Sequence, residues 1–206
     1  IAKHPMDGVR YTKPVRAVDD IHFLTREEQA IFLETAKRSH NYRQYVLLLE
    51  TDLRTSELIG LTWDSIDWKK HALTINKTLE YRHKNKCWRA GPPKTEKSYR
   101  TIPLTDRAYA VLKSCYDERD SRKESDTLSQ VLEYMDRRTG RTGTLVMKDL
   151  VFINYRTGEP AKNSSYDTHL YKLCDEAGIE HFCMHALRHT YATRAIASGM
   201  QPKVLQ

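Results

Sequence analysis

Two short segments carry side chains whose types and spacing suit chemistry on a phosphate group. The first is His185-Ala186-Leu187-Arg188-His189-Thr190. On a helix, His185 and Arg188 share one face and His189 lies beside them. A guanidinium there can neutralise phosphoryl oxygens, and an imidazole can donate a hydrogen bond or move a proton. Two alternatives are open: a structural histidine pair, or a zinc site, although the metalloprotease pattern needs Glu where Ala186 stands.

The second segment is Thr51-Asp52-Leu53-Arg54-Thr55-Ser56-Glu57-Leu58. Arg54 stands at a predicted break between two helices, where a long side chain can reach a shared cleft. Glu57 follows three residues later and can orient Arg54 if the intervening turn is helical. The alternative is a surface ion pair, which adds less than about 1 kcal/mol to stability.

Basic residues concentrate between these two segments. The chain has a net charge of +7, and residues 77–100 hold eight bases against two acids. The bases are Lys77, Arg82, Lys84, Lys86, Arg89, Lys94, Lys97 and Arg100. Such a stretch can neutralise backbone phosphates of a nucleic acid and release their counterions. We therefore predict DNA contacts for Lys77, Arg82, Lys84, Lys86, Arg89, Lys97 and Arg100; a solvated hairpin without a partner is the alternative.

Taken in order, T-x-L-R-x-S-E-L, Pro93-Lys94-Thr95 with Arg100-Thr-Ile-Pro-Leu, and H-x-L-R-H-T resemble one protein family. It is the catalytic domain of the tyrosine recombinases (the phage integrase family), and the integrases of conjugative transposons are most similar. By this resemblance Arg54, Lys94, His185 and Arg188 are the expected catalytic residues. Lys94 would be the general acid, for which Lys97 is the weaker candidate. Glu57 would brace the site and His189 would be structural.

The resemblance implies site-specific recombination, the integration and excision of a mobile element. Duplex DNA would be cut and rejoined through a 3′-phosphotyrosyl intermediate, without metal or other cofactor. The complete protein would act as a tetramer on DNA. The chain ends before the position of the family's nucleophilic tyrosine, so we expect it to bind DNA without cleaving it. We also expect this chain to be a monomer in solution. The alternatives are a degenerate, non-catalytic DNA-binding module and an enzyme like the type IB topoisomerases.

One position departs from the family pattern. Asp52 stands where the family usually has glycine. If the backbone there needed a positive φ, Asp would tolerate it less well than Gly and would disturb Arg54.

The predicted elements make an α+β fold that is mainly helical with a small antiparallel β-sheet. Thr25 and Glu28 form a capping box that begins a helix, and further helices are expected over about 42–50 and 56–61. The alternating run 72–79 and residues 100–104 predict strands. Helices are then expected from 105 to 116, through a polar, helix-rich insertion within 117–149, across 166–177, from 184 to 197, and from Pro202 onward.

The composition excludes a membrane protein, a fibrous protein and a disulfide scaffold. Hydrophobic residues make up 39% of the 206 residues, and no apolar run is long enough to span a membrane. The four cysteines form no C-x-x-C pair, so we expect reduced thiols in a cytoplasmic protein. We assign 1–22 to an N-terminal arm or interdomain linker and 23–206 to a catalytic domain that lacks the family's N-terminal domain and C-terminal tail.

Overall fold

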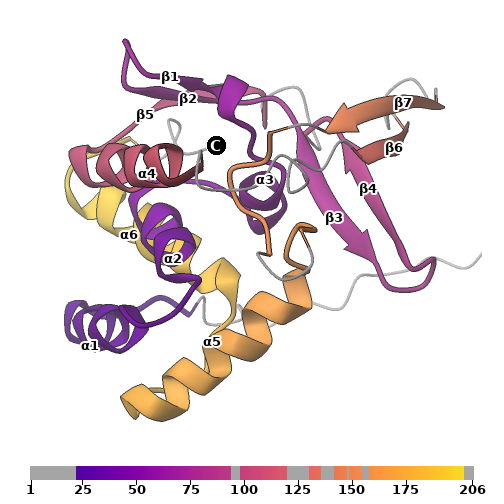
Figure 1. Ribbon diagram of the computed structural model, residues 1–206. Helices are drawn as coiled ribbons and strands as arrows, with labels where there is room; N and C mark the ends of the chain where they lie inside the picture. Colours follow the sequence, from indigo (N-terminus) through magenta and orange to yellow (C-terminus); the bar gives the residue numbers. More distant parts are fainter. Residues whose placement is uncertain are drawn as a thin grey trace, which may run out of the picture.

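Figure 1 shows the computed structural model, which describes residues 22–93, 98–119, 130–135, 142–147, 149–154 and 158–201. The helices are α1 (Arg26–Ala36), α2 (Tyr42–Glu50), α3 (Thr55–Ile59), α4 (Asp106–Glu118), α5 (Asn163–Ala177) and α6 (Met184–Ala197), with a 3-10 turn at Trp63–Ser65. The strands are β1 (Ile66–Asp67), β2 (Ala72–Ile75), β3 (Thr78–Arg82), β4 (Cys87–Gly91), β5 (Arg100–Pro103), β6 (Gln130–Met135) and β7 (Thr142–Met147).

The structure confirms the predicted start of α1 at Thr25 and the predicted end of α5 at Gly178. The hydroxyl of Thr25 accepts from the Glu28 N–H, and the Glu28 carboxylate accepts from the Thr25 N–H, so the capping box of α1 is complete. Gly178 ends α5 in the left-handed conformation with φ 65°, which glycine adopts without steric cost. The helix expected from Pro202 lies outside the described residues, as do residues 1–21 of the arm assigned to 1–22.

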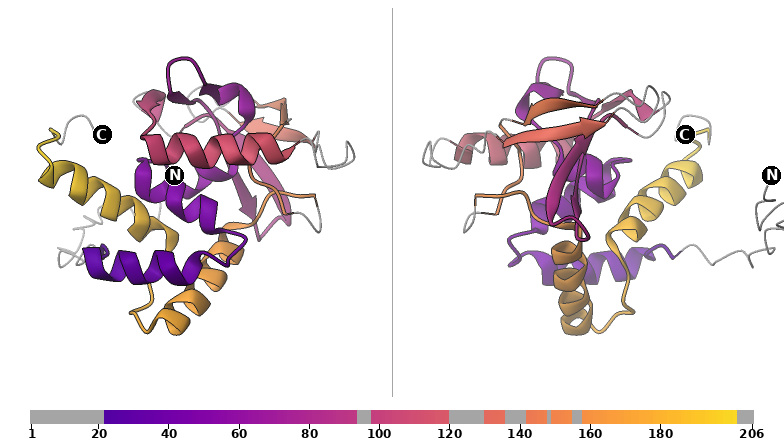
Figure 2. Two further views of the ribbon diagram at one scale, coloured as in Figure 1. Left: turned by 60° about the vertical axis from the view of Figure 1, so that its left-hand side comes forward. Right: turned by 90° about the vertical axis from the view of Figure 1, so that its right-hand side faces the viewer.

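Helix α2 is the centre of the hydrophobic core. Its residues 44–49 are all buried, because α6 and α4 pack against it. In Figure 1, α1, α2, α4 and α6 gather on one side of the molecule and strands β3, β4, β6 and β7 on the other. Figure 2 shows α5 and α6 diverging from the loop that joins them, which directs α6 back toward α2.

The strands form two sheets where we expected one. Strands β1, β2 and β5 pair antiparallel, and β3, β4, β6 and β7 make a second sheet. The predicted strand 72–79 is interrupted after Ile75, where the chain leaves the first sheet to enter the second at Thr78. Alternation alone did not reveal this change, because side chains alternate in both strands.

The prediction of a helix-rich insertion within 117–149 is wrong for residues 130–135 and 142–147, although α4 extends into it as far as Glu118. Residues 130–135 and 142–147 are paired as an antiparallel hairpin, and β6 also pairs parallel to β4 through Ala90 and Tyr134. Both segments contain β-branched or aromatic residues, which favour strands. The balanced charge of the surrounding segment had suggested a solvated helix.

Helix α3 lies directly on β3. A Cβ at Gly60 would come within 2.9 Å of the Leu79 backbone nitrogen, so only glycine permits this approach. Leu58, Ile59 and Leu79 are buried at this contact. The packing fixes α3, and with it the backbone of Arg54, relative to the sheets. None of the described helices is long and apolar enough to cross a membrane.

Candidate phosphate-binding site

Arg54 is held at the beginning of α3 by Glu57. The Glu57 carboxylate accepts from the Arg54 backbone N–H at 2.9 Å and from its Nη1 at 2.8 Å. Only 1% of the Glu57 side chain is exposed, against 40% for Arg54. The pair is therefore a buried carboxylate fixing a guanidinium that still reaches the surface, and the alternative of a surface ion pair is excluded.

Arg100, the first residue of β5, binds the same carboxylate. Its Nη1 and Nη2 donate to Glu57 at 3.2 and 2.9 Å, and Nη2 also donates to the Asp52 carbonyl oxygen at 2.5 Å. The Arg100 side chain is 16% exposed. We expected Arg100 among the DNA contacts, but its guanidinium is directed into the protein.

Asp52 joins this group to α6. Its Oδ2 accepts from Arg188 Nη2 at 2.8 Å and lies 3.7 Å from Arg100 Nη2. Among the described non-glycine residues, only His71, Lys86 and Asp149 have positive φ, so Asp52 occupies its position without the strain considered above. The order Arg54, Glu57, Arg100, Asp52, Arg188 alternates positive and negative charges, and we call these five residues the charge chain.

The first two turns of α6 are fixed by contacts with other parts of the domain. Leu187 is fully buried, and the Asp167 carboxylate accepts from the Met184 N–H at 3.1 Å. The Thr190 hydroxyl accepts from the Leu24 N–H at 2.9 Å and donates to the Ala186 carbonyl at 2.8 Å. These contacts set the rotation of α6, so that Arg188 faces Asp52.

His185 and His189 lie next to each other on α6, with ring centroids 4.5 Å apart and nearly perpendicular planes. Burial lowers the pKa of His185, and the charges of Arg188 and Arg54 lower it further. Burial and Arg188 also lower the pKa of His189. The two sequence segments meet in one site, because Arg188 of the second segment donates to the Asp52 carboxylate of the first at 2.8 Å.

The acidic members of the charge chain differ in their titration. Burial alone would raise the pKa of Glu57, but hydrogen bonds from Arg100 and the Arg54 N–H outweigh it and leave that pKa below its ordinary value. Burial raises the pKa of Asp52, and the Arg188 and Arg100 charges oppose that rise only in part. Burial also lowers the pKa of Arg188, against the pull of Asp52.

The remaining predicted bases fall into three groups. Lys84 and Lys86 are exposed in the turn between β3 and β4, and Arg89 is half-buried on β4. Lys77 and Arg82 instead have acidic partners, Asp64 at 3.0 Å and Glu80 at 2.5 Å. The general-acid candidates Lys94 and Lys97 lie outside the described residues.

Sequence reasoning named the two arginines, the histidine and Glu57, but it missed the part that Asp52 and Arg100 take in the site. Arg100 looked like one more base of a basic stretch, and Asp52 looked like a substituted glycine. The available signal was that Asp52 directly precedes Leu53, an apolar residue in the break between two helices.

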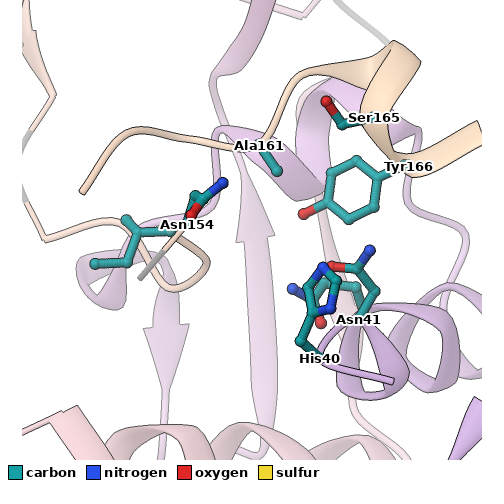
Figure 3. Close-up of a pocket in the computed structure, with 8 residues that line it drawn as sticks. His40, Asn41, Asn154, Ala161, Ser165 and Tyr166 are labelled. Carbon is teal, nitrogen blue, oxygen red and sulfur yellow. The ribbon is translucent and has the colours of Figure 1, made fainter. Parts of the chain in front are cut away.

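A separate cavity of about 440 Å³ lies between the beginnings of α2 and α5. Figure 3 shows His40, Asn41, Asn154, Ala161, Ser165 and Tyr166 around it. No residue of the charge chain lines this cavity, and its described lining residues include no lysine or arginine that could bind an anion. Among the described residues, no three potential ligands of the His, Cys, Asp and Glu types gather as a metal site.

The family comparison agrees with the order of the motifs. The model of the phage integrase family matches residues 22–206. The chain belongs to the phage integrase family. The transposase of transposon Tn916 from Enterococcus faecalis is 30% identical over 195 residues, which cover 89% of this chain and 43% of the transposase. A XerC-like tyrosine recombinase from Caldanaerobacter subterraneus subsp. tengcongensis is 26% identical, covering all of this chain and 52% of that protein.

Solved structures of integrases and recombinases share the fold. The Tn1549 transposon integrase (residues 82–397), in complex with circular intermediate DNA, superposes with a TM-score of 0.72 at 24% identity, covering 90% of this chain and 57% of that one. For XerA recombinase the TM-score is 0.63 at 20% identity, with 89% and 54% covered. The mainly helical α+β fold class is thus confirmed. This phage integrase family member spans about half the length of the curated relatives it matches.

We predict that Glu57→Gln lowers the free energy of unfolding by about 3 kcal/mol, because two guanidinium groups lose a buried counter-charge. Urea unfolding at pH 7.5 measures the change. Glu34→Gln is the matched control, since Glu34 forms an exposed i,i+3 ion pair with Lys37 and should matter little. Equal effects of the two substitutions would contradict a bracing role for Glu57.

We further predict that stability decreases as the pH falls from 7.5 to 6, and that His185→Gln reduces this loss. The pKa of His185 is lowered in the folded chain, so the unfolded chain takes up protons first and acid favours unfolding. His189 contributes with the same sign, so the loss should shrink without vanishing. Urea unfolding across this pH range is the measurement. Between pH 8 and 9 the free energy of unfolding should depend on pH in the same way for the two proteins. A loss of stability below pH 7.5 that is equal in both proteins would refute the prediction.

Proposed function

We propose that this chain is the catalytic domain of a tyrosine recombinase that cleaves and rejoins duplex DNA at specific sites, integrating or excising a mobile element. The observation that carries the proposal is that hydrogen bonds through Glu57, Arg100 and Asp52 connect Arg54 to Arg188, which lies one turn after His185 on α6, although Arg54 and Arg188 are far apart in sequence. Two guanidinium groups and an imidazole can stabilise the charge of a five-coordinate phosphorus without a metal ion.

In the proposed reaction a tyrosine hydroxyl gives its proton to water as its oxygen attacks the scissile phosphorus, and the bond from phosphorus to the 5′ oxygen breaks. Lys94 gives its proton to the leaving 5′ oxygen, which becomes a hydroxyl group. Arg54 and Arg188 neutralise the non-bridging oxygens, and His185 donates a hydrogen bond to one of them. Attack by a 5′ hydroxyl reverses these steps, so the phosphodiester is restored without a nucleotide cofactor.

The acidic residues of the charge chain act indirectly. Glu57 holds Arg54 and Arg100, so we assign Glu57 a bracing role and Arg100 a structural one. His189 packs against His185 and supports it.

The proposed partner is double-stranded DNA, and we propose that the complete protein works as a tetramer on paired DNA sites in the cytoplasm.

The hairpin of β3 and β4 supplies a second DNA contact in this proposal. Lys84 and Lys86 are exposed on it and Arg89 is half-buried, and none of the three forms an ion pair with another described residue, whereas Lys77 and Arg100 face acidic groups of the protein. The hairpin is also attached to the body of the domain, since His83 Nε2 lies 3.3 Å from the Ser164 hydroxyl of α5 and the Lys162 ammonium lies over the Tyr81 ring. A fixed hairpin can present these bases to DNA in one orientation.

Covalent trapping tests the chemistry. The complete gene product that contains this chain is incubated with a pool of nicked duplexes of randomised sequence, and protein–DNA adducts are isolated under denaturing conditions and sequenced. We expect a 3′-phosphotyrosyl adduct on a defined sequence, reduced at least about a hundredfold by Arg54→Ala or Arg188→Ala. Duplex binding without any adduct would instead identify a non-catalytic DNA-binding module.

Salt dependence tests the hairpin contact. Replacing Lys84, Lys86 and Arg89 together by Ala should reduce the slope of log affinity against log salt by about 2 to 3, because each lost phosphate contact removes about 0.9. Fluorescence anisotropy with a mixed-sequence duplex gives the slope. The control replaces Lys37, Lys70 and Lys113, which have acidic partners elsewhere on the surface. If the control changes the slope equally, the hairpin makes no particular contact.

A further inference from the structure

Asp52 is a buried carboxylate at the centre of the proposed phosphate site. Its side chain is only 8% exposed, although it lies beside residues that would face DNA. The carboxylate binds Arg188 at 2.8 Å, and the carbonyl oxygen of the same residue accepts from Arg100 at 2.5 Å. Asp52 thus holds two guanidinium groups from two different elements, β5 and α6.

Arg188 is left with an unused donor. Its side chain is 14% exposed, Nη2 donates to Asp52, and Nη1 is buried with no hydrogen-bond partner among the described residues. A buried donor without an acceptor costs free energy, and more so when it is charged. The site is therefore complete only when an acceptor reaches Nη1, and a negatively charged oxygen is the best acceptor for a guanidinium.

The two ends of the guanidinium consequently have different tasks. A long arginine side chain has several rotamers, and holding one of them costs conformational entropy. The bond from Nη2 to Asp52 fixes the plane of the guanidinium before any ligand arrives. Nη1 is then held in a fixed position with its hydrogen-bonding capacity unused, and preorganised donors of this kind stabilise charge without reorganising during the reaction.

We propose that Asp52 is a positioning residue, whose carboxylate orients Arg188 so that Nη1 meets a phosphate oxygen of DNA. This inference rests on the proposed function, because it takes the ligand of Arg188 to be a DNA phosphate. The inference goes beyond the proposed function because it gives an acidic residue, Asp52, a role in a site that binds an anion. Asp52 contributes to DNA binding through Arg188, despite its own repulsion of phosphates.

The opposite role makes the opposite prediction. If Asp52 were a counter-ion that competes with phosphate for Arg188, its removal would free the guanidinium and strengthen binding. In that case Arg188 would contribute more to DNA affinity when Asp52 is absent. The sign of the coupling between Asp52 and Arg188 therefore separates the two roles.

The experiment is a double-mutant cycle on DNA affinity. Fluorescence anisotropy at low salt gives the Kd of a labelled mixed-sequence duplex for the unaltered chain, Asp52→Ala, Arg188→Ala and the double variant. We expect Arg188→Ala to weaken binding about tenfold when Asp52 is present and about twofold when it is absent. Asp52→Ala alone should weaken binding about fivefold, although it removes a negative charge.

Two further variants serve as controls for folding and for the change in net charge. Asp52→Asn keeps an oxygen that can accept from Arg188 Nη2, so it should retain affinity within about threefold of the unaltered chain. It replaces Asp52→Ala in the cycle if thermal unfolding shows that the alanine variant does not fold. Glu180→Gln removes the same charge from an exposed position and should leave the Kd unchanged.

The outcomes are distinguishable. Tighter binding by Asp52→Ala or Asp52→Asn, or an effect of Arg188→Ala that is equal or larger without Asp52, overturns the positioning role and leaves the proposed function intact. If the unaltered chain does not bind duplex DNA, or if Arg188→Ala has no effect on its binding, the proposed function and the role of Asp52 both fail.

Discussion

The buried carboxylate of Glu57 is the constraint on which the arrangement of the site depends. A carboxylate with a 1% exposed side chain has lost its hydration, and a partner must replace it. Here the replacements are the guanidinium groups of Arg54 and Arg100 and the backbone N–H of Arg54. Because the carboxylate cannot be left unpaired, α3 and β5 can take only relative positions that bring these donors to it.

The same requirement extends along the charge chain to α6. Arg100 lies between Glu57 and Asp52, and Asp52 passes the constraint to Arg188. Each acid is shared by two arginines, so the displacement of either acid would deprive two guanidinium groups of their counter-charge. The apolar core sets where the helices lie, and the charge chain sets how the functional side chains are turned. Stability and orientation therefore come from different interactions in this domain.

This separation explains what the sequence could and could not predict. Local signals were sufficient for Thr25 at the start of α1 and for Gly178 at the end of α5, because both act within a few residues. Strand pairing was only partly local: β4 pairs with its neighbour β3 and also with the distant β6, and the β6–β7 hairpin was hidden in a segment of balanced charge. Arg100 was assigned to DNA for the same reason, since nothing near it in the sequence indicates that Glu57 is its partner.

In the proposed function, the distribution of charge separates two contributions to DNA binding. The charge chain holds three arginines and two acids, so its formal charge is only about +1, too small to attract a duplex from a distance. If the domain binds DNA as proposed, long-range attraction comes from basic side chains elsewhere, such as the exposed Lys84 and Lys86 of the β3–β4 hairpin. In the charge chain, the acids reduce the net charge but fix the direction of each guanidinium. A site that must stabilise a short-lived charge gains more from oriented donors than from a larger field, because donors that are already in place need not reorganise. The acids in the site are therefore compatible with binding an anion, and they make its arginines directional.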